Sequence, residues 1–284
     1  MKVIQSPQIS QKIIQALKKR GRKIGFVPTM GYLHEGHLSL VRKAKKENDT
    51  VVVSIFVNPL QFGPKEDLKR YPSDLKRDSA LLKKEGIDFL FLPKNQDFYP
   101  KDFQTEVKVK ALSQDLCGKS RPVHFAGVAT VVLKLLHLIP ANNLYVGLKD
   151  YQQYRVVSQM VKDLSLPVKV IGCSIVREKD GLAMSSRNIF LSENERQQAL
   201  LLPQALKKAK QLIEKGERRA NTVLDAAKKS LSRANKARLD YLEIVDALTL
   251  EPMIQLKANS TVLVAAAVYF SKTRLIDNCL AKVR

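Results

Sequence analysis

The sequence lacks tryptophan, has only three cysteines and contains no long apolar run. Cys117, Cys173 and Cys279 are far apart and show neither CxxC nor the Cys/His spacing of a zinc site, and a chain of 284 residues buries a sizeable core without disulfides. Reduced thiols in a cytoplasmic protein are therefore expected. The most apolar stretch, VATVVLKLLHLIP, is interrupted by Lys134 and His137 and falls short of the roughly 20 apolar residues of a membrane span. These absences predict a soluble protein without a membrane segment.

Acidic residues are also few: 27 Asp and Glu face 49 Lys and Arg, which gives a formal net charge of +22. A basic surface raises the encounter rate with anions, among them ATP, carboxylic acids and nucleic acids. Proteins that read single-stranded nucleic acids usually place exposed aromatic side chains among the basic ones. The basic residues here gather instead in helical stretches such as KKAKQLIEKGERR. Most of the charge is therefore interpreted as solvated helix surface, and nucleic acid is not a predicted partner.

Short apolar runs alternate with amphipathic stretches through the first part of the chain. The runs are rich in β-branched and aromatic residues and cover 23–27, 50–57, 87–92, 143–147 and 168–171. Residues 1–21 lack the apolar segment of a signal peptide and instead predict an amphipathic helix. Strands that alternate with helices predict an α/β fold, a Rossmann-like doubly wound parallel sheet over residues 1–175, with ligands at the carboxyl ends of its strands.

The pattern changes near residue 175. A loop, CSIVREKDGLAMSSRN, leads into charged helices that cover residues 193–234. The later runs LDYLEIVDALTL and STVLVAAAVYF predict strands. A smaller C-terminal α+β domain with a few antiparallel strands is expected over residues 176–284.

The strongest local signal is VPTMGYLHEGHLSL, in which a strand ends at Pro28 and a helix follows. Gly31 and Gly36 loosen the backbone between them, and His34 and His37 share one helix face because they are three residues apart. Ring N–H groups and free amides at a helix N-terminus can bind phosphate oxygens. The alternatives are paired surface histidines or a two-histidine metal site, and no nearby residue supplies the third protein ligand that zinc needs.

Polar residues also follow two other predicted strands. FVNPLQFG presents Asn58 and Gln61, neutral amides that can hold a hydroxyl and a carboxylate, or that can simply cap the turn after a proline. GLKDYQQ presents Lys149, which suits a phosphate, and Asp150, which suits a ribose hydroxyl or the shell of Mg²⁺. Gly147 allows a ligand to approach the backbone.

GLAMSSRN offers two hydroxyls and a permanent cation: Ser185, Ser186 and Arg187. They follow Gly181 on a loop that is predicted to be flexible, which suits a lid that closes over a triphosphate and neutralises it. A turn with satisfied serines is the alternative.

These motifs resemble those of the pantothenate synthetase family. HEGH has the form of the HxGH signature of the nucleotidyl-transferase superfamily, and further blocks follow in the family's order: VVVSIFVNPLQFG, YPSDLKRD, RPVHFAGVATVV, GLKDYQQ, VREKDGLAMSSRN and TRLIDN. Together they span nearly the whole chain. The resemblance implies a ligase that condenses (R)-pantoate with β-alanine through a pantoyl-adenylate, uses ATP and Mg²⁺, and forms a cytoplasmic homodimer.

The resemblance also implies roles for individual residues. Catalysis is expected of His34, His37, Lys149, Ser185, Ser186 and Arg187. ATP is expected to contact Met30, Gly31, His34, Gly36, His37, Gly147, Lys149, Asp150, Val176, Met184, Ser185, Ser186 and Arg187. The other substrates are expected to contact Met30, Asn58, Gln61 and Gln153. Asp78 matches a family acid near the metal, but Arg77 stands where some members have a second acid, so Asp78 is expected to meet Mg²⁺ only indirectly.

Some positions depart from the family's usual residues. Val123 stands for Gly, Ala126 for Arg and Leu148 for Glu, and VYFS replaces an RVG-like turn. None of these changes removes a predicted phosphate or pantoate contact. An RNA-binding protein on a degenerate synthetase-like fold is the alternative function that the charge keeps open.

Overall fold

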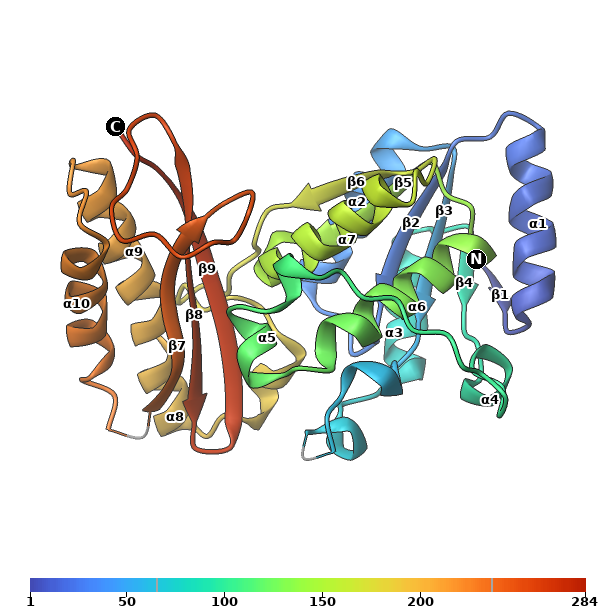
Figure 1. Cartoon of the computed structure of the whole chain (residues 1–284). Helices are drawn as coiled ribbons and strands as arrows, with labels where there is room; N and C mark the ends of the chain where they lie inside the picture. The colour runs from blue at the N-terminus through green and yellow to red at the C-terminus, as the bar shows by residue number, and fades with distance from the viewer. Residues whose placement is uncertain (65, 236) are drawn as a thin grey trace. The chain divides into compact units, whose positions relative to one another are not determined.

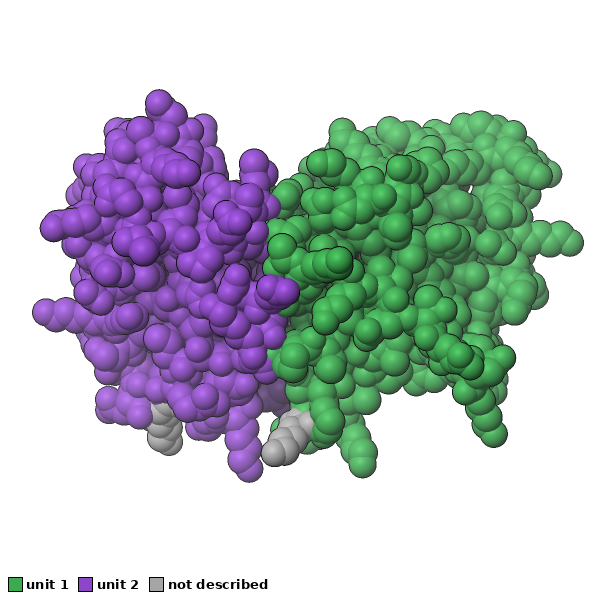
Figure 2. Space-filling view, in the orientation of Figure 1, with its two compact units in different colours: residues 1–113, 121–148, 153–174 green, residues 114–120, 149–152, 175–284 purple. Residues whose placement is uncertain are grey.

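The computed structural model describes residues 1–64, 66–235 and 237–284. The chain forms two compact units, which Figure 2 colours separately. Unit 1 consists of residues 1–113, 121–148 and 153–174, and unit 2 of residues 114–120, 149–152 and 175–284. Two short segments, 114–120 and 149–152, thus pack with unit 2, although the predicted boundary near residue 175 assigns them to the first domain.

Unit 1 is built on a six-stranded sheet in the order β1-β4-β3-β2-β5-β6, with all neighbouring strands parallel (Figure 1). The strands are β1 (Lys2–Ile4), β2 (Ile24–Thr29), β3 (Thr50–Ile55), β4 (Phe89–Phe91), β5 (Asn143–Gly147) and β6 (Lys169–Cys173). The five predicted strands are confirmed as β2 to β6. The sequence did not predict β1, which pairs with β4 at the edge of the sheet.

Helices cover both faces of this sheet, which confirms the doubly wound fold. The helices are α1 (Pro7–Lys19), α2 (Glu35–Glu47), α3 (Leu75–Lys84), α4 (Asn95–Phe98), α6 (His124–Leu138) and α7 (Tyr151–Asp163). On one face, Ile14 of α1 and Val157 of α7 share a core with Phe26 of β2. On the other face, Val41 of α2 packs in a core with Val27, the next residue of β2. The alternation follows from the period of two along a strand.

The sheet reverses its winding at β2. From β2 the chain proceeds outward through β3 to β4, and it then returns to the opposite side of β2 for β5 and β6. β2 and β5 are neighbours in the sheet, and the chain continues from β2 toward one edge of the sheet and from β5 toward the other edge. This switch point is where open α/β sheets bind ligands, and the HEGH motif follows β2 directly.

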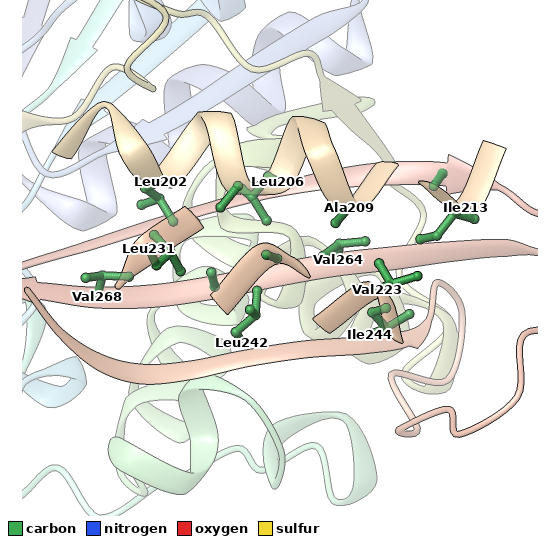
Figure 3. Packing of buried hydrophobic residues seen from close by; sticks show 14 of the residues in the cluster. Leu202, Leu206, Ala209, Ile213, Val223, Leu231, Leu242, Ile244, Val264 and Val268 are labelled. Carbon is green, nitrogen blue, oxygen red and sulfur yellow. The ribbon is translucent and has the colours of Figure 1, made fainter. Parts of the chain in front are cut away.

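Unit 2 contains a three-stranded antiparallel sheet in the order β7-β8-β9. Its elements are α5 (Cys117–Ser120), α8 (Glu193–Ala199), α9 (Leu201–Glu214), α10 (Ala220–Leu231), β7 (Ala237–Asp246), β8 (Thr261–Phe270) and β9 (Thr273–Lys282). Figure 3 shows Leu206 of α9, Val223 of α10 and Val264 of β8 pointing into one apolar core. The predicted α+β character is confirmed, whereas β9 was not predicted as a strand.

Candidate active site

The segment after β2 turns sharply before α2 begins. Gly31 has φ +84° and Tyr32 has φ +50°, and both values lie in the left-handed region that favours glycine. A Cβ on Gly31 would lie 3.0 Å from Ile55 Cγ2 and 3.2 Å from Asp78 Oδ2. The Gly31 N–H donates to Thr29 Oγ1, whose hydroxyl donates to the Ser54 carbonyl of β3. Both conformation and space therefore favour glycine at position 31.

Asp78 holds this turn from α3. Its carboxylate accepts hydrogen bonds from the backbone N–H of Tyr32 at 2.7 Å and of Leu33 at 2.8 Å, one on each oxygen. The side chain is 1% exposed, and Arg77 lies 3.7 Å away. Burial raises the pKa of Asp78, and the two backbone hydrogen bonds oppose that rise. Because both oxygens bind the turn, the geometry gives Asp78 a structural role, and its indirect contact with Mg²⁺ stays a prediction.

His34 and His37 stack at the start of α2. His34 is the residue before the helix, and its backbone N–H donates to Nδ1 of His37 at 3.3 Å. The ring centroids are 4.0 Å apart. Since Nδ1 of His37 accepts this bond, the neutral ring carries its proton on Nε2, the nitrogen that can donate to a phosphate oxygen. The paired arrangement predicted from HEGH is thus present at a helix N-terminus.

Gln61 lies in η1 (Pro59–Gln61), directly after β3, and meets the turn that follows β2. Its Nε2 donates to the Met30 sulfur at 3.0 Å, and its Oε1 accepts from Asn58 Nδ2 at 3.1 Å. Two residues that were predicted to contact pantoate, Met30 and Gln61, therefore lie against each other in unit 1.

Asn58 lies behind Gln61 and is 1% exposed. Its amide donates to Gln61 Oε1 and to the Gly127 carbonyl, and its oxygen accepts from the Tyr99 hydroxyl and the Leu60 N–H. An amide has two donor hydrogens and two acceptor lone pairs, so these four bonds use its full capacity. The geometry therefore gives Asn58 the role of orienting Gln61, and the direct contact of Asn58 with substrate stays a prediction.

Further residues that the sequence did not assign to the site hold the backbone of Gln61. The buried ring of His124 donates from Nδ1 to the Gln61 carbonyl at 3.0 Å, and Arg121 donates to the same oxygen at 3.3 Å. Arg121 in turn pairs with Glu66 through bonds of 2.8 and 2.6 Å. Both donors belong to the block RPVHFAGVATVV, at and just before the start of α6. They are about 60 residues from Gln61 in the sequence, so no local pattern indicated that they bind η1.

Gly147 ends β5, at the strand end beside β2. A Cβ on Gly147 would meet nothing within 4 Å, so protein packing does not demand glycine here and the space is open to a ligand. Gln153 lies one turn into α7 and is half-buried. Both residues belong to unit 1.

In unit 2, Lys149 and Asp150 belong to η4 (Leu148–Asp150). Lys149 Nζ lies 3.5 Å from Asp150 Oδ1, and the Lys149 side chain is 20% exposed. The Lys149 carbonyl accepts a hydrogen bond from Asn278 Nδ2 at 2.8 Å. The ammonium is thus held close to a carboxylate while its backbone is tied to β9.

The 176–187 segment of unit 2 folds back on itself. The Met184 N–H donates to the Val176 carbonyl, Arg177 and Ala183 form an antiparallel bridge, and Gly181 turns the chain at φ +95°. η5 (Ser186–Phe190) follows, and Ser185 caps it by accepting from the Arg187 N–H at 3.2 Å. The hydroxyl of Ser185 keeps its hydrogen for donation. The predicted flexible loop is in this structure a hydrogen-bonded hairpin.

The described residues offer no ready-made metal centre: within 1–64, 66–235 and 237–284, no three His, Cys, Asp or Glu side chains are grouped to hold an ion. The two-histidine motif is therefore not part of a zinc site in this portion of the chain. Mg²⁺ usually binds through one or two carboxylates together with substrate phosphates and water. Asp150, whose side chain is 45% exposed, fits such a partial site.

The doubly wound sheet, with stacked histidines at a helix N-terminus beside its switch point, defines a nucleotide-binding α/β protein of the HxGH kind. A sequence profile of the pantoate-beta-alanine ligase family matches residues 2–280. The chain belongs to this family.

Relatives of similar length support this assignment. The chain is 51% identical to a pantothenate synthetase of Caldicellulosiruptor bescii, over 100% of both chains, and 53% identical to one of Thermotoga petrophila, over 99% of both. Pantothenate synthetase from Thermus thermophilus has a similar structure, with a TM-score of 0.91 and 45% identity over 98% of this chain and 99% of that one. Pantoate-beta-alanine ligase from Francisella tularensis, solved with β-γ ATP and β-alanine, gives a TM-score of 0.80 at 38% identity, over 99% and 97%.

Proposed function

We propose that this protein condenses (R)-pantoate with β-alanine at the expense of ATP, and that it releases pantothenate, AMP and pyrophosphate. The observation that supports this most directly is the contact between Met30 and Gln61. It joins the turn that leads to the stacked histidines, which suit phosphate, to an amide that suits a carboxylate and a hydroxyl. Family membership supports the same reaction, and the Francisella relative was solved with an ATP derivative and β-alanine.

The first step forms the pantoyl-adenylate. A carboxylate oxygen of pantoate attacks the α-phosphorus of ATP, the bond from that phosphorus to the bridging oxygen breaks, and pyrophosphate leaves. Gln61 and Gln153 hold pantoate in line. The Nε2 hydrogen of His37 donates to the α-phosphate oxygens as charge builds on them. His34, Lys149, Ser185, Ser186 and Arg187 supply further donors and positive charge to the phosphates.

The second step forms the amide. The β-alanine amine attacks the carbonyl carbon of the adenylate, the carbon–oxygen bond to AMP breaks, and the amine loses a proton. No covalent bond to the protein is required. We assign His37 the role of proton donor at the phosphate, through its Nε2 hydrogen. Closure of the 176–187 segment would protect the mixed anhydride from water.

Magnesium is proposed to arrive with ATP. When bound with ATP, the ion would supply positive charge that offsets the charge of the triphosphate. Asp150 is the carboxylate in η4 that fits its shell, since the oxygens of Asp78 are engaged by backbone N–H groups.

The experiment is to measure pyrophosphate and AMP release from ATP and Mg²⁺ with pantoate and β-alanine supplied separately and together. We expect pyrophosphate to require only pantoate, and AMP and pantothenate to require both. Absence of pantoate-dependent turnover in a folded sample would refute the proposal. None of the relatives described above bears a name that indicates RNA binding, and steep salt-dependent RNA affinity in the same sample would be needed to revive that alternative.

The cellular location and the oligomeric state are proposed from membership of the family. No helix in the described parts of the chain is long and apolar enough to cross a membrane. We propose a cytoplasmic homodimer, which light scattering of the purified protein would test through its molar mass.

A further inference from the structure

The TRLIDN block near the C-terminus contains none of the residues predicted to bind a substrate, and it forms the first part of β9. Asp277 pairs with Ala266 and Asn278 with Ala265 of β8. Successive residues of a strand point to opposite faces of the sheet. Asp277 therefore shares the face of the unit 2 core with Leu275, and Asn278 lies on the other face. Both residues are buried, at 3% and 6% exposure.

Asp277 fixes the base of the 176–187 hairpin. Its carboxylate accepts two parallel bonds from the Arg177 guanidinium, at 2.7 and 3.0 Å. The same guanidinium donates to the Gly181 carbonyl at the hairpin turn. A two-pronged arginine–carboxylate pair fixes orientation as well as distance. The buried Asp277 carboxylate thus anchors the first strand of the hairpin, which contains Arg177. The second strand pairs with it through Ala183 and leads to Met184 and Ser185.

Asn278 fixes the backbone of Lys149 on the other face. Its Nδ2 donates to the Lys149 carbonyl at 2.8 Å. Its own N–H donates to Asp277 Oδ1 at 2.8 Å, which links the two anchors. The two adjacent residues thus hold two segments that are far apart in the sequence, each expected to bind the triphosphate.

We propose that Asp277 and Asn278 are positioning residues for ATP, through which β9 sets the placement of Lys149 and of the 184–187 segment. This inference rests on the proposed function, since it takes these two segments as the triphosphate-binding ones. All the contacts involved lie within unit 2. Neither residue touches the reacting atoms, so their replacement changes ATP use by displacing other side chains.

The experiment compares Asp277→Asn, Asn278→Asp and Leu275→Ala with the wild type. In Asp277→Asn, an NH₂ group replaces one of the two carboxylate oxygens that accept from Arg177. In Asn278→Asp, a carboxylate oxygen replaces the NH₂ group that donates to the Lys149 carbonyl, so that two acceptors face each other. Leu275 is 4% exposed and on the same strand, and the hydrogen bonds with Arg177 and with the Lys149 carbonyl come from other side chains, so its truncation loosens β9 without removing either anchoring bond. We expect each anchor variant to raise the KM for ATP by about 10- to 100-fold, with little change in the KM for pantoate. Leu275→Ala should lower the melting temperature and leave the KM for ATP unchanged.

Hydrogen exchange provides a second readout that does not depend on turnover. In Asp277→Asn, the amide of Met184, which bonds to the Val176 carbonyl, should exchange faster than in Leu275→Ala. If wild-type protein turns over pantoate but both anchor variants match Leu275→Ala in the KM for ATP and in exchange, the inference is wrong and the proposed function stands. If wild-type protein does not turn over pantoate, the proposed function fails, while unchanged Met184 exchange would separately overturn the anchoring by Asp277.

Discussion

Replacement of Gly127 by alanine tests how Gln61, the amide that we propose to bind pantoate, is held. Gly127 lies within α6, where alanine would ordinarily stabilise the helix by about 1 kcal/mol relative to glycine. Here a Cβ would lie 2.2 Å from the Leu60 carbonyl oxygen and 2.5 Å from the Gln61 nitrogen. These are backbone atoms of η1, which cannot rotate away as a flexible side chain would. Ordinary contact would require α6 and η1 to separate by about 1 Å.

The separation should affect both stability and pantoate binding. Overpacking typically costs about 1–3 kcal/mol, which exceeds the helix-propensity gain, so we expect a net loss in the free energy of unfolding. Because Gln61 moves with η1, kcat/KM for pantoate should fall by up to about 100-fold. The KM for ATP should change much less. Urea unfolding and steady-state kinetics at saturating ATP would measure these effects.

Gly63→Ala is the matched control. Gly63 follows η1, and the nearest atom to its added Cβ would be Glu66 Oε1 at 3.7 Å, an ordinary contact. This variant should retain both stability and the KM for pantoate. The reasoning would be refuted if Gly127→Ala were as stable as the wild type and bound pantoate equally well, because α6 and η1 would then not be in the close contact described.

Three further predictions concern neighbouring residues. His37→Ala should reduce pantoate-dependent pyrophosphate release by about 100-fold or more without changing the far-ultraviolet circular dichroism, since it removes a phosphate donor and no core packing; near-normal release would contradict its role. Asp78→Asn should lower the free energy of unfolding by about 1–3 kcal/mol in urea, because the amide sets a donor against one of two buried N–H groups; equal stability would show that the turn does not need the carboxylate. Burial is the largest single influence on the pKa of Glu66 and raises it, but the hydrogen bond and charge of Arg121, together with a backbone hydrogen bond from Gly63, outweigh burial and leave the pKa below its usual value. The stability that this pair contributes is present above the unfolded-state pKa of about 4.3 and lost as the pH falls through the folded-state value. Glu66→Gln should therefore flatten the acid decline of the melting temperature, and an unchanged decline would contradict the assignment.

The sequence predicted the strands that carry clear apolar runs and missed β1 and β9. β3, for example, carries the run TVVVSI, which is almost entirely buried. β1 has only three residues, of which Ile4 alone is buried. β9 is ten residues long, but its core-facing positions include Asp277, whose charge breaks the apolar alternation. Its partner Arg177 is 100 residues away in the sequence, so no local pattern reveals that the charge is paired.

The same reasoning separates the site residues that the sequence could place from those it could not. His34 and His37 were predictable because their spacing and the start of α2 are local features. Asn58 and Asp78 also have partners that are distant in the sequence, since Gly127 and Tyr32 lie 69 and 46 residues away from them. Residue type alone made both side chains look available to a ligand, whereas the fold uses them to bind its own polar groups.

Three family blocks contain a residue that positions the backbone of a segment in another element, and each of these segments is one that we propose to bind a ligand. Asp78 in YPSDLKRD binds the N–H groups of the turn before the histidines, Gly127 in RPVHFAGVATVV lets α6 contact η1, and Asn278 in TRLIDN binds the Lys149 carbonyl. In each case the held atom belongs to the main chain, so a change in side-chain type at the held position leaves the contact intact. The residues that position these segments are therefore different from the residues whose side chains are proposed to bind the ligands. A relative that retains HEGH, Gln61 and Lys149 but loses these three residues should keep the fold and bind its substrates poorly, because alignment of the reacting groups depends on displacements of about 1 Å.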